Sequence, residues 1–275
     1  MKLTVLLDNN TYTGQYYLGE PGLCYYIEED GLTMLLDTGY SDVALRNAPK
    51  LGCDLSKVQK IALSHGHNDH TGGLAYMAKT MDISGVEVLA HPDAFLPKRN
   101  DNGKMFGSPM SEDELDKVTR LSFSTEPVWL TDKLVWLGEI PRVHAWEKNL
   151  SLGEATDSED SDEWHKDSLP DDTALALKTP KGVFVITGCS HSGICNIITR
   201  ALEVCGDRRL YGVMGGMHLT SLDERSEKSI AFMENLHPEV LYPAHCTCFE
   251  VRAEMVKRGL PVGVVAVGMK LEIQN

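Results

Sequence analysis

The chain has 275 residues, of which 42% are hydrophobic and 24% charged, an ordinary composition for a globular protein with a substantial core. Its net charge of −14, without a basic patch, disfavours binding to the nucleic-acid backbone. The longest apolar stretches, such as residues 262–269, are too short to span a membrane, and residues 3–7 are too short for the apolar region of a signal peptide. We therefore expect a cytoplasmic protein that binds neither nucleic acid nor membrane.

The seven cysteines are an odd set with no Cys-x-x-Cys pair. A chain with an evident core does not need disulfides for stability, so we expect reduced thiols. Two of them, Cys189 and Cys246, lie close in sequence to histidines that are candidate metal ligands.

Short strands dominate the first third of the chain. β-rich runs separated by turn signals predict strands at residues 2–8, 16–18, 23–28 and 33–37. A helix should follow over residues 41–50, capped by Ser41 and ended by Gly52. Strands and helices then alternate, which predicts strands at 60–64, 86–91, 182–187, 210–214 and 240–242 and helices at 72–80, 194–205 and 223–236.

Five of these strands end in polar or ligand-type residues, which are Asp37, His65, His191, His218 and His245. In α/β architectures, functional groups collect where strands end and loops begin. We expect these residues to converge on one edge of the fold and to form a preorganised pocket.

The cluster His65-x-His67-x-Asp69-His70 has metal-ligand spacing. Residues two apart on an extended segment face the same side, so His65 and His67 can hold one cation. Asp69 and His70 lie past the bend and can face a second cation. Imidazole with carboxylate suits zinc first, with iron and manganese as alternatives.

This cluster resembles the HxHxDH motif of the metallo-β-lactamase superfamily. It lies in the segment Ser64-His-Gly-His-Asn-Asp-His-Thr-Gly-Gly73. Asp37, in Asp-Thr-Gly, matches the strand-ending aspartate that supports the histidine loop in that family. His245, in Tyr-Pro-Ala-His-Cys, matches a histidine that binds the second metal. The resemblance implies an α/β fold, a four-layer αββα sandwich of two mixed sheets flanked by helices. It also implies one domain over residues 1–275 that holds two divalent metal ions.

Three further segments resemble one subgroup of that superfamily, and they are residues 187–191, 215–219 and 243–247. Members of this subgroup are described either as class II metal-dependent hydrolases or as synthases that join a dihydropterin to ribofuranosylaminobenzene phosphate. The resemblance therefore leaves both a hydrolase and a transferase open.

The chain departs from the family pattern at two places. The usual Gly-His-x-x-Gly loop is missing, and residues 169–173 (Leu-Pro-Asp-Asp-Thr) occupy its region. The family's bridging aspartate falls on Cys189. We expect His191 to be the replacement ligand, with Cys189 as a further candidate ligand. The alternative for Cys189 is a small buried residue under the site.

Two other histidines are candidates for substrate contact. His218 follows a Gly-Gly pair that leaves room for a ligand, and His91 also ends a strand. Residues 98–117 and 144–172 are predicted insertions or lids over the pocket, with a plain surface loop as the alternative. Residues 154–172 carry nine acidic residues and one lysine, so this segment is either a solvated loop or a lid that adds Asp171 or Asp172 to the site.

Two cations that share a hydroxide lower the pKa of its parent water towards ~7, which is the machinery of ester hydrolysis. Asp69 can orient the nucleophile while it serves as a ligand, so it is the expected catalytic residue. We predict a hydrolase of a small ester, lactone or phosphodiester metabolite. The alternatives are a transferase like the pterin-joining synthases and a catalytically weak ligand-binding or sensing protein. The sequence predicts no oligomeric state.

Overall fold

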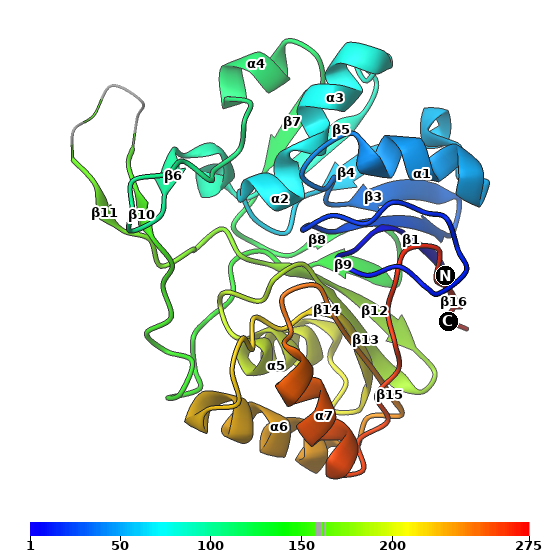
Figure 1. Ribbon diagram of the computed structural model, residues 1–275, viewed down its shortest axis with the longest axis vertical. Coiled ribbons are helices and arrows are strands. Elements are labelled where there is room, and N and C mark those ends of the chain that lie inside the picture. The colour runs from blue at the N-terminus through cyan, green and yellow to red at the C-terminus, as the bar shows by residue number, and fades with distance from the viewer. Residues whose placement is uncertain (158–160, 162, 275) are drawn as a thin grey trace.

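Two mixed β-sheets lie face to face in the computed structural model, which describes residues 1–157, 161 and 163–274 (Figure 1). The first sheet contains, in spatial order, β16 (Lys270–Glu272), β1 (Lys2–Leu7), β2 (Cys24–Glu29), β3 (Leu32–Leu36), β4 (Lys60–Ala62), β5 (Glu87–Ala90) and β7 (Arg120–Phe123). The second contains β15 (Val240–Ala244), β14 (Leu210–Gly216), β13 (Gly182–Thr187), β12 (Ala174–Thr179), β9 (Leu134–Trp136) and β8 (Val128–Trp129). Parallel pairing joins β3, β4, β5 and β7 in the first sheet and β13, β14 and β15 in the second.

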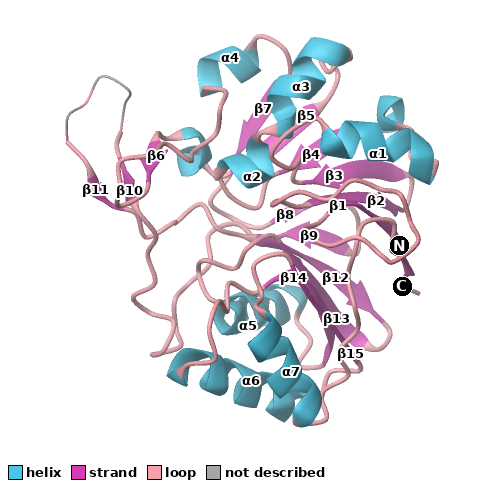
Figure 2. Ribbon diagram, viewed as in Figure 1, coloured by secondary structure: helices cyan, strands magenta, loops and turns pink. Residues whose placement is uncertain are grey.

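Apolar side chains from both sheets fill the layer between them, including Leu36 from the first and Trp136 and Phe184 from the second. Helices α1 (Val43–Leu51) and α3 (Gly73–Thr80) pack on the outer face of the first sheet. Three helices cover the outer face of the second sheet, and these are α5 (Ile194–Cys205), α6 (Glu224–Leu236) and α7 (Phe249–Lys257) (Figure 2). This order of layers confirms the predicted αββα sandwich.

Strand β13 shows how the sequence encodes this layering. Val183 and Val185 face the helices, whereas Phe184 and Ile186 face the other sheet. A strand covered on both faces is apolar at successive positions. The observed bounds of β13 are therefore those predicted from its unbroken apolar run.

Two local predictions were wrong. Residues 16–18 form a loop and not a strand, because the side chain of Asn47 bonds both the N–H and the carbonyl of Leu18. The N-cap of α1 is Asp42 and not Ser41, whereas Gly52 ends that helix at φ 76° as predicted. Neither α7 nor the short α2 (Asn68–Thr71) was predicted.

A small third sheet projects from one side of the sandwich (Figure 1). It consists of β6 (Lys98–Arg99), β10 (Glu154–Ala155) and β11 (His165–Lys166), with α4 (Glu112–Asp116) following β6 in the chain. Both predicted insertions contribute strands to this sheet, and their function as lids stays a prediction. Residues 158–160 and 162 of the predicted acidic loop lie outside the described part. In that described part, no helix has the length and apolar character needed to cross a membrane.

Candidate metal centre

The candidate site lies where strands of both sheets end. Asp37 follows β3 and His65 follows β4, both in the first sheet. Cys189 and His191 follow β13, and His245 follows β15, all in the second sheet. The convergence that the sequence predicted for these strand ends is therefore present.

The loop between β4 and α3 changes direction within six residues. His65 and His67 lie in its extended part, and His67 is the N-cap of α2. Asp69 and His70 lie on the single turn of α2, where the ring of His70 still lies beside that of His65, with centroids 4.2 Å apart. Gly66 makes the bend possible, because a Cβ at this position would lie 1.8 Å from the carbonyl oxygen of Ala94.

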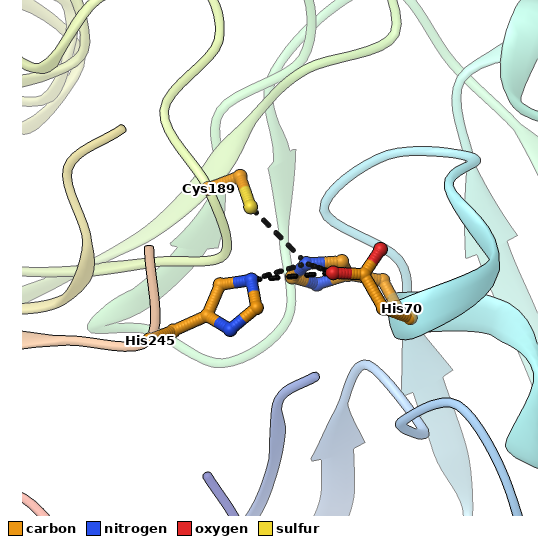
Figure 3. A group of neighbouring side chains, drawn as sticks. His70, Cys189 and His245 are labelled. Atoms are coloured by element: carbon orange, nitrogen blue, oxygen red, sulfur yellow. Dashed lines mark hydrogen bonds and ion pairs between the residues drawn. The ribbon is translucent and has the colours of Figure 1, made fainter. Parts of the chain in front are cut away.

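The first group of potential ligand atoms belongs to Asp69, His70, Cys189 and His245 (Figure 3). His70 Nε2 lies 3.3 Å from His245 Nε2 and 3.2 Å from Cys189 Sγ. Asp69 Oδ2 lies 3.3 Å from His245 Nε2. Figure 3 shows the side chains of His70, Cys189 and His245 pointing toward one another from three separate segments of the chain.

A second group lies beside the first. His65, Cys189 and His191 bring ligand atoms within 4.8 Å of one another, and so do His65, His67 and Asp69. Cys189 belongs to the first group and to one of the other two, as Asp69 does, so the Cys189 thiol lies between the two candidate sites. This is the place that the family resemblance assigns to a bridging carboxylate.

The imidazole tautomers are set by neighbouring acceptors. His70 Nδ1 donates to Asp37 Oδ2 at 2.6 Å, and His245 Nδ1 donates to Asn9 Oδ1 at 2.8 Å. Because Ser64 Oγ donates to Asp37, it accepts from His65 Nδ1 at 3.0 Å. In each case Nε2 is the ring nitrogen that is left to face the cluster, which is how histidine ligands are held in metal sites.

These residues fit a divalent metal. The Nε2 atoms of His67 and His191 are buried and have no hydrogen-bond partner among the described residues. Buried imidazole nitrogens are normally paired, and a metal ion would satisfy that of His191, whereas His67 faces His65 Nε2 with its Nδ1, at 3.0 Å. Imidazole, carboxylate and thiol are all groups that bind divalent cations such as zinc, and the choice of metal stays a prediction.

Burial lowers the pKa of His65, His67 and His191, and neighbouring imidazoles lower it further. These three rings are therefore neutral, the form that binds metal. Burial alone would also lower the pKa of His70, but Asp69 and Asp37 raise it to about 9. A proton on His70 keeps its Nε2 from repelling that of His245, and a divalent cation can replace the proton in that role.

Four strand-end residues have left-handed backbone conformations, with φ of 57° at Asp37, 65° at Ser190, 45° at His218 and 47° at His245. Non-glycine residues avoid this region unless the surroundings enforce it, and such strain collects at functional sites. At His245 the enforcing contact is Asp8, whose carboxylate accepts the His245 N–H at 3.1 Å. Sequence reasoning missed Asp8, and read Asn9 only as a turn residue.

Residues 169–173 occupy the place of the missing Gly-His-x-x-Gly loop. Asp171 accepts a hydrogen bond from the N–H of Gly66 at 2.8 Å, and its other oxygen accepts from the buried Lys98 at 3.1 Å. Asp172 accepts from both the N–H and the hydroxyl of Ser192. These two aspartates hold the segments that carry the histidines, and neither belongs to a group of ligand atoms.

The two predicted substrate contacts lie in different surroundings. The ring of His218 packs on that of His191, with centroids 4.3 Å apart, and so lies beside the cluster. His91 instead accepts from the N–H of Asp93, and its Nε2 lies 4.0 Å from a carboxylate oxygen of Glu139.

Two cavities lie near the candidate metal centre, and the larger one adjoins the histidine loop. A cleft of about 790 Å³ meets it on the outer side, at Asn68 and Gly72, and is walled by Tyr76 and Trp164. A smaller cavity of about 120 Å³ is lined by His191 and His218. The small cavity is thus the one that opens on a candidate ligand.

The comparisons with known proteins agree with this geometry. The family model described as the metallo-β-lactamase superfamily matches residues 17–245. The solved structure of Tm1679, described as a metal-dependent hydrolase of the β-lactamase superfamily, is 31% identical, covers 100% of both chains and has a TM-score of 0.83.

Two curated relatives come from Methanocaldococcus jannaschii. An uncharacterised protein is 29% identical over 92% of this chain and 93% of its own length. A 7,8-dihydropterin-6-methyl-4-(β-D-ribofuranosyl)-aminobenzene-5′-phosphate synthase is 27% identical over 91% of this chain and 88% of its own length. Fold, family model and relatives together show that this chain belongs to the metallo-β-lactamase superfamily.

Proposed function

We propose that this protein is a metal-dependent hydrolase with two divalent cations that acts on a small ester, lactone or phosphodiester. The observation that carries the proposal is the convergence of histidine ring nitrogens with Asp69 and Cys189, together with the buried Nε2 of His191, which has no hydrogen-bond partner among the described residues. The donor set favours zinc, with iron and manganese as alternatives.

Each cation would have its own set of ligands. We assign His65, His67 and His191 to one cation and Asp69, His70 and His245 to the other. Cys189 shares a group of ligand atoms with members of each set. When bound, such a pair supplies Lewis acidity towards a carbonyl or phosphoryl oxygen and makes water a better nucleophile at neutral pH.

The chain's own groups supply orientation and protonation state. Burial alone would raise the pKa of Asp69, but His70 and His245 hold it below its usual range, so this carboxylate is ionised and can accept a hydrogen bond from the attacking water. Asp37 fixes the ring of His70, and Asn9 fixes that of His245, which preserves the geometry through the reaction.

A second candidate function is group transfer. The 27% identical relative named as a synthase supports it, because that similarity extends over nearly the whole chain. In a transferase the same residues would bind the metals, but water would have to be excluded from the acceptor position. A partner that is a small molecule fits both functions and the acidic surface of the chain.

The test combines elemental analysis of the purified protein with a panel of phosphodiester, phosphate ester and lactone substrates. Hydrolysis adds one water to a single substrate, whereas transfer joins two substrates and releases a leaving group, so mass analysis of the products separates the two. His67→Ala serves as the metal-deficient control. A protein that holds two metals and turns over nothing in the panel would contradict the hydrolase and favour ligand binding.

A further inference from the structure

The cavity of about 120 Å³ beside the cluster is lined by polar and apolar side chains and by one cation, Arg225. His191, His218, Thr220 and Arg225 all contribute to it. Since a water takes ~30 Å³ of liquid volume, the cavity has room for one charged group and not for a whole metabolite. A substrate that reaches the metal centre past His191 could place such a group there.

The guanidinium group of Arg225, which lines this cavity, has donors that no described residue pairs with. Its Nε and Nη2 atoms are buried and have no hydrogen-bond partner among the described residues. These two N–H groups lie along one edge of the planar guanidinium, the edge that binds a carboxylate or phosphate through two parallel hydrogen bonds. Buried donors of a charged group are costly to leave unpaired, so an acceptor from outside the chain would satisfy this edge.

The position of Arg225 on its helix supports a role in binding. Arg225 lies in the first turn of α6, whose N-cap is Asp223. A cation in the first turn opposes the helix dipole, so helix stability does not account for an arginine here. Asp223 lies nearby, but its oxygens already accept from the N–H of Ser226 and the hydroxyl of Ser221.

We propose that Arg225, with Thr220 and His218, forms a subsite that binds a phosphate group of the substrate next to the metal centre. The proposal rests on the proposed function and narrows its substrate class to phosphorylated small molecules. Arg225 supplies two parallel donors and a positive charge, and the Thr220 hydroxyl supplies a third donor. A phosphate group has enough oxygens to accept from all of them and still face His191. The phosphate group bound in this subsite is not the group that reacts, so its contacts hold the rest of the substrate in position at the metal centre.

The test measures binding of inorganic phosphate to the metal-loaded protein by calorimetry at fixed ionic strength, for wild type and Arg225→Gln. We expect Arg225→Gln to weaken phosphate binding at least ~10-fold while metal content stays unchanged. The matched control is Arg200→Gln, because Arg200 also has a buried, unpartnered Nε but pairs with Glu203 on α5. Its phosphate affinity should stay within about twofold of wild type.

Equal phosphate affinity in wild type and Arg225→Gln would overturn the subsite, and so would a wild type that binds no phosphate. An equal loss of acetate binding in Arg225→Gln would overturn the assignment to phosphate. If Arg225→Gln fails to fold, the experiment uses Arg225→Lys, because lysine keeps the charge but lacks the edge with two donors. Unchanged phosphate affinity in Arg225→Lys would likewise overturn the two-donor argument. The readout needs no turnover, so a protein that binds phosphate through Arg225 but hydrolyses nothing contradicts the hydrolase proposal and leaves the subsite standing.

Discussion

Replacing Lys98 by methionine should destabilise the protein and loosen the histidine loop together. Lys98 lies in β6 and is 1% exposed, with Nζ 2.8 Å from Asp167 and 3.1 Å from Asp171. Burial alone would lower the pKa of Lys98, but the two aspartates raise it, so the amine is charged. Its removal leaves two buried carboxylates side by side without a cation.

Breaking a buried ion pair by removing one partner costs about 3–5 kcal/mol. The lower half of that range applies here, because each aspartate keeps a backbone donor: Leu169 N–H for Asp167 and Gly66 N–H for Asp171. At roughly 2 °C per kcal/mol for a chain of this size, the Tm should fall by about 6–8 °C. Differential scanning calorimetry measures this shift.

The same substitution has a pH signature. Without Lys98, the ionised carboxylates of Asp167 and Asp171 repel each other in the folded protein. This repulsion destabilises the folded state at high pH, and it shrinks as protonation sets in at low pH. The Tm deficit of Lys98→Met should therefore be smaller at pH 5 than at pH 8.

Lys228→Met is the matched control, since Lys228 also pairs with a carboxylate, Glu224, but on the exposed face of α6. Exposed pairs contribute little, so its Tm should match wild type. A Lys98→Met protein with wild-type Tm at both pH values would refute the reasoning, because it would mean that the aspartates are solvated. Weaker metal binding in Lys98→Met would show that Asp171 transmits the effect to Gly66.

Four further predictions concern the metal centre. His67→Ala should lose at least one metal while its circular dichroism spectrum stays native, and full metal content by elemental analysis would contradict this. Asp37→Ala should weaken metal affinity ~10- to 100-fold in a chelator competition, because Asp37 orients the ring of His70; unchanged affinity would reduce Asp37 to a turn residue. Metal must displace the proton of His70, whose pKa is about 9, so metal affinity should rise with pH up to about 9. Calorimetry should also detect the released proton. A metal affinity that does not change with pH would contradict this prediction. His191→Ala should lower metal content and rate together, whereas Cys189→Ser should lose less than ~10-fold in rate, or ~1.4 kcal/mol of barrier. Two results together would show that Cys189 is the ligand and His191 is not. They are a sulfur-to-metal band in the cobalt-substituted protein that disappears in Cys189→Ser, and a His191→Ala variant that keeps both metals.

The parts of the fold that the sequence predicted are those whose pattern is set by local geometry. Strand β13 is apolar because both of its faces are covered, and α5 buries Ile194, Ile197 and Ile198 at helical spacing. Helix α7 was not predicted because only Val251 and Met255 of its residues are buried, and two apolar positions do not establish a helical periodicity.

The candidate ligands were recognisable for the same local reason. A short loop must place several donors around a cation, so His65 to His70 have a spacing that the chemistry imposes. The groups that hold the ligands obey no such rule. Asp171 meets the loop at Gly66 from 105 residues away, and Asn9 meets His245 from 236 residues away.

The departure from the family pattern is best understood through these distant contacts. The usual loop would bring a histidine to the first cation, whereas here Asp171 and Asp172 anchor the segments on either side of that place. Asp172 fixes Ser192, the residue after His191, so it positions the ring that we propose as the replacement for the missing ligand. On this proposal, the missing ligand is offset by a carboxylate that positions another one. Such a substitution leaves no motif, because Asp172 needs only to accept two hydrogen bonds and not to lie at a fixed spacing from any ligand.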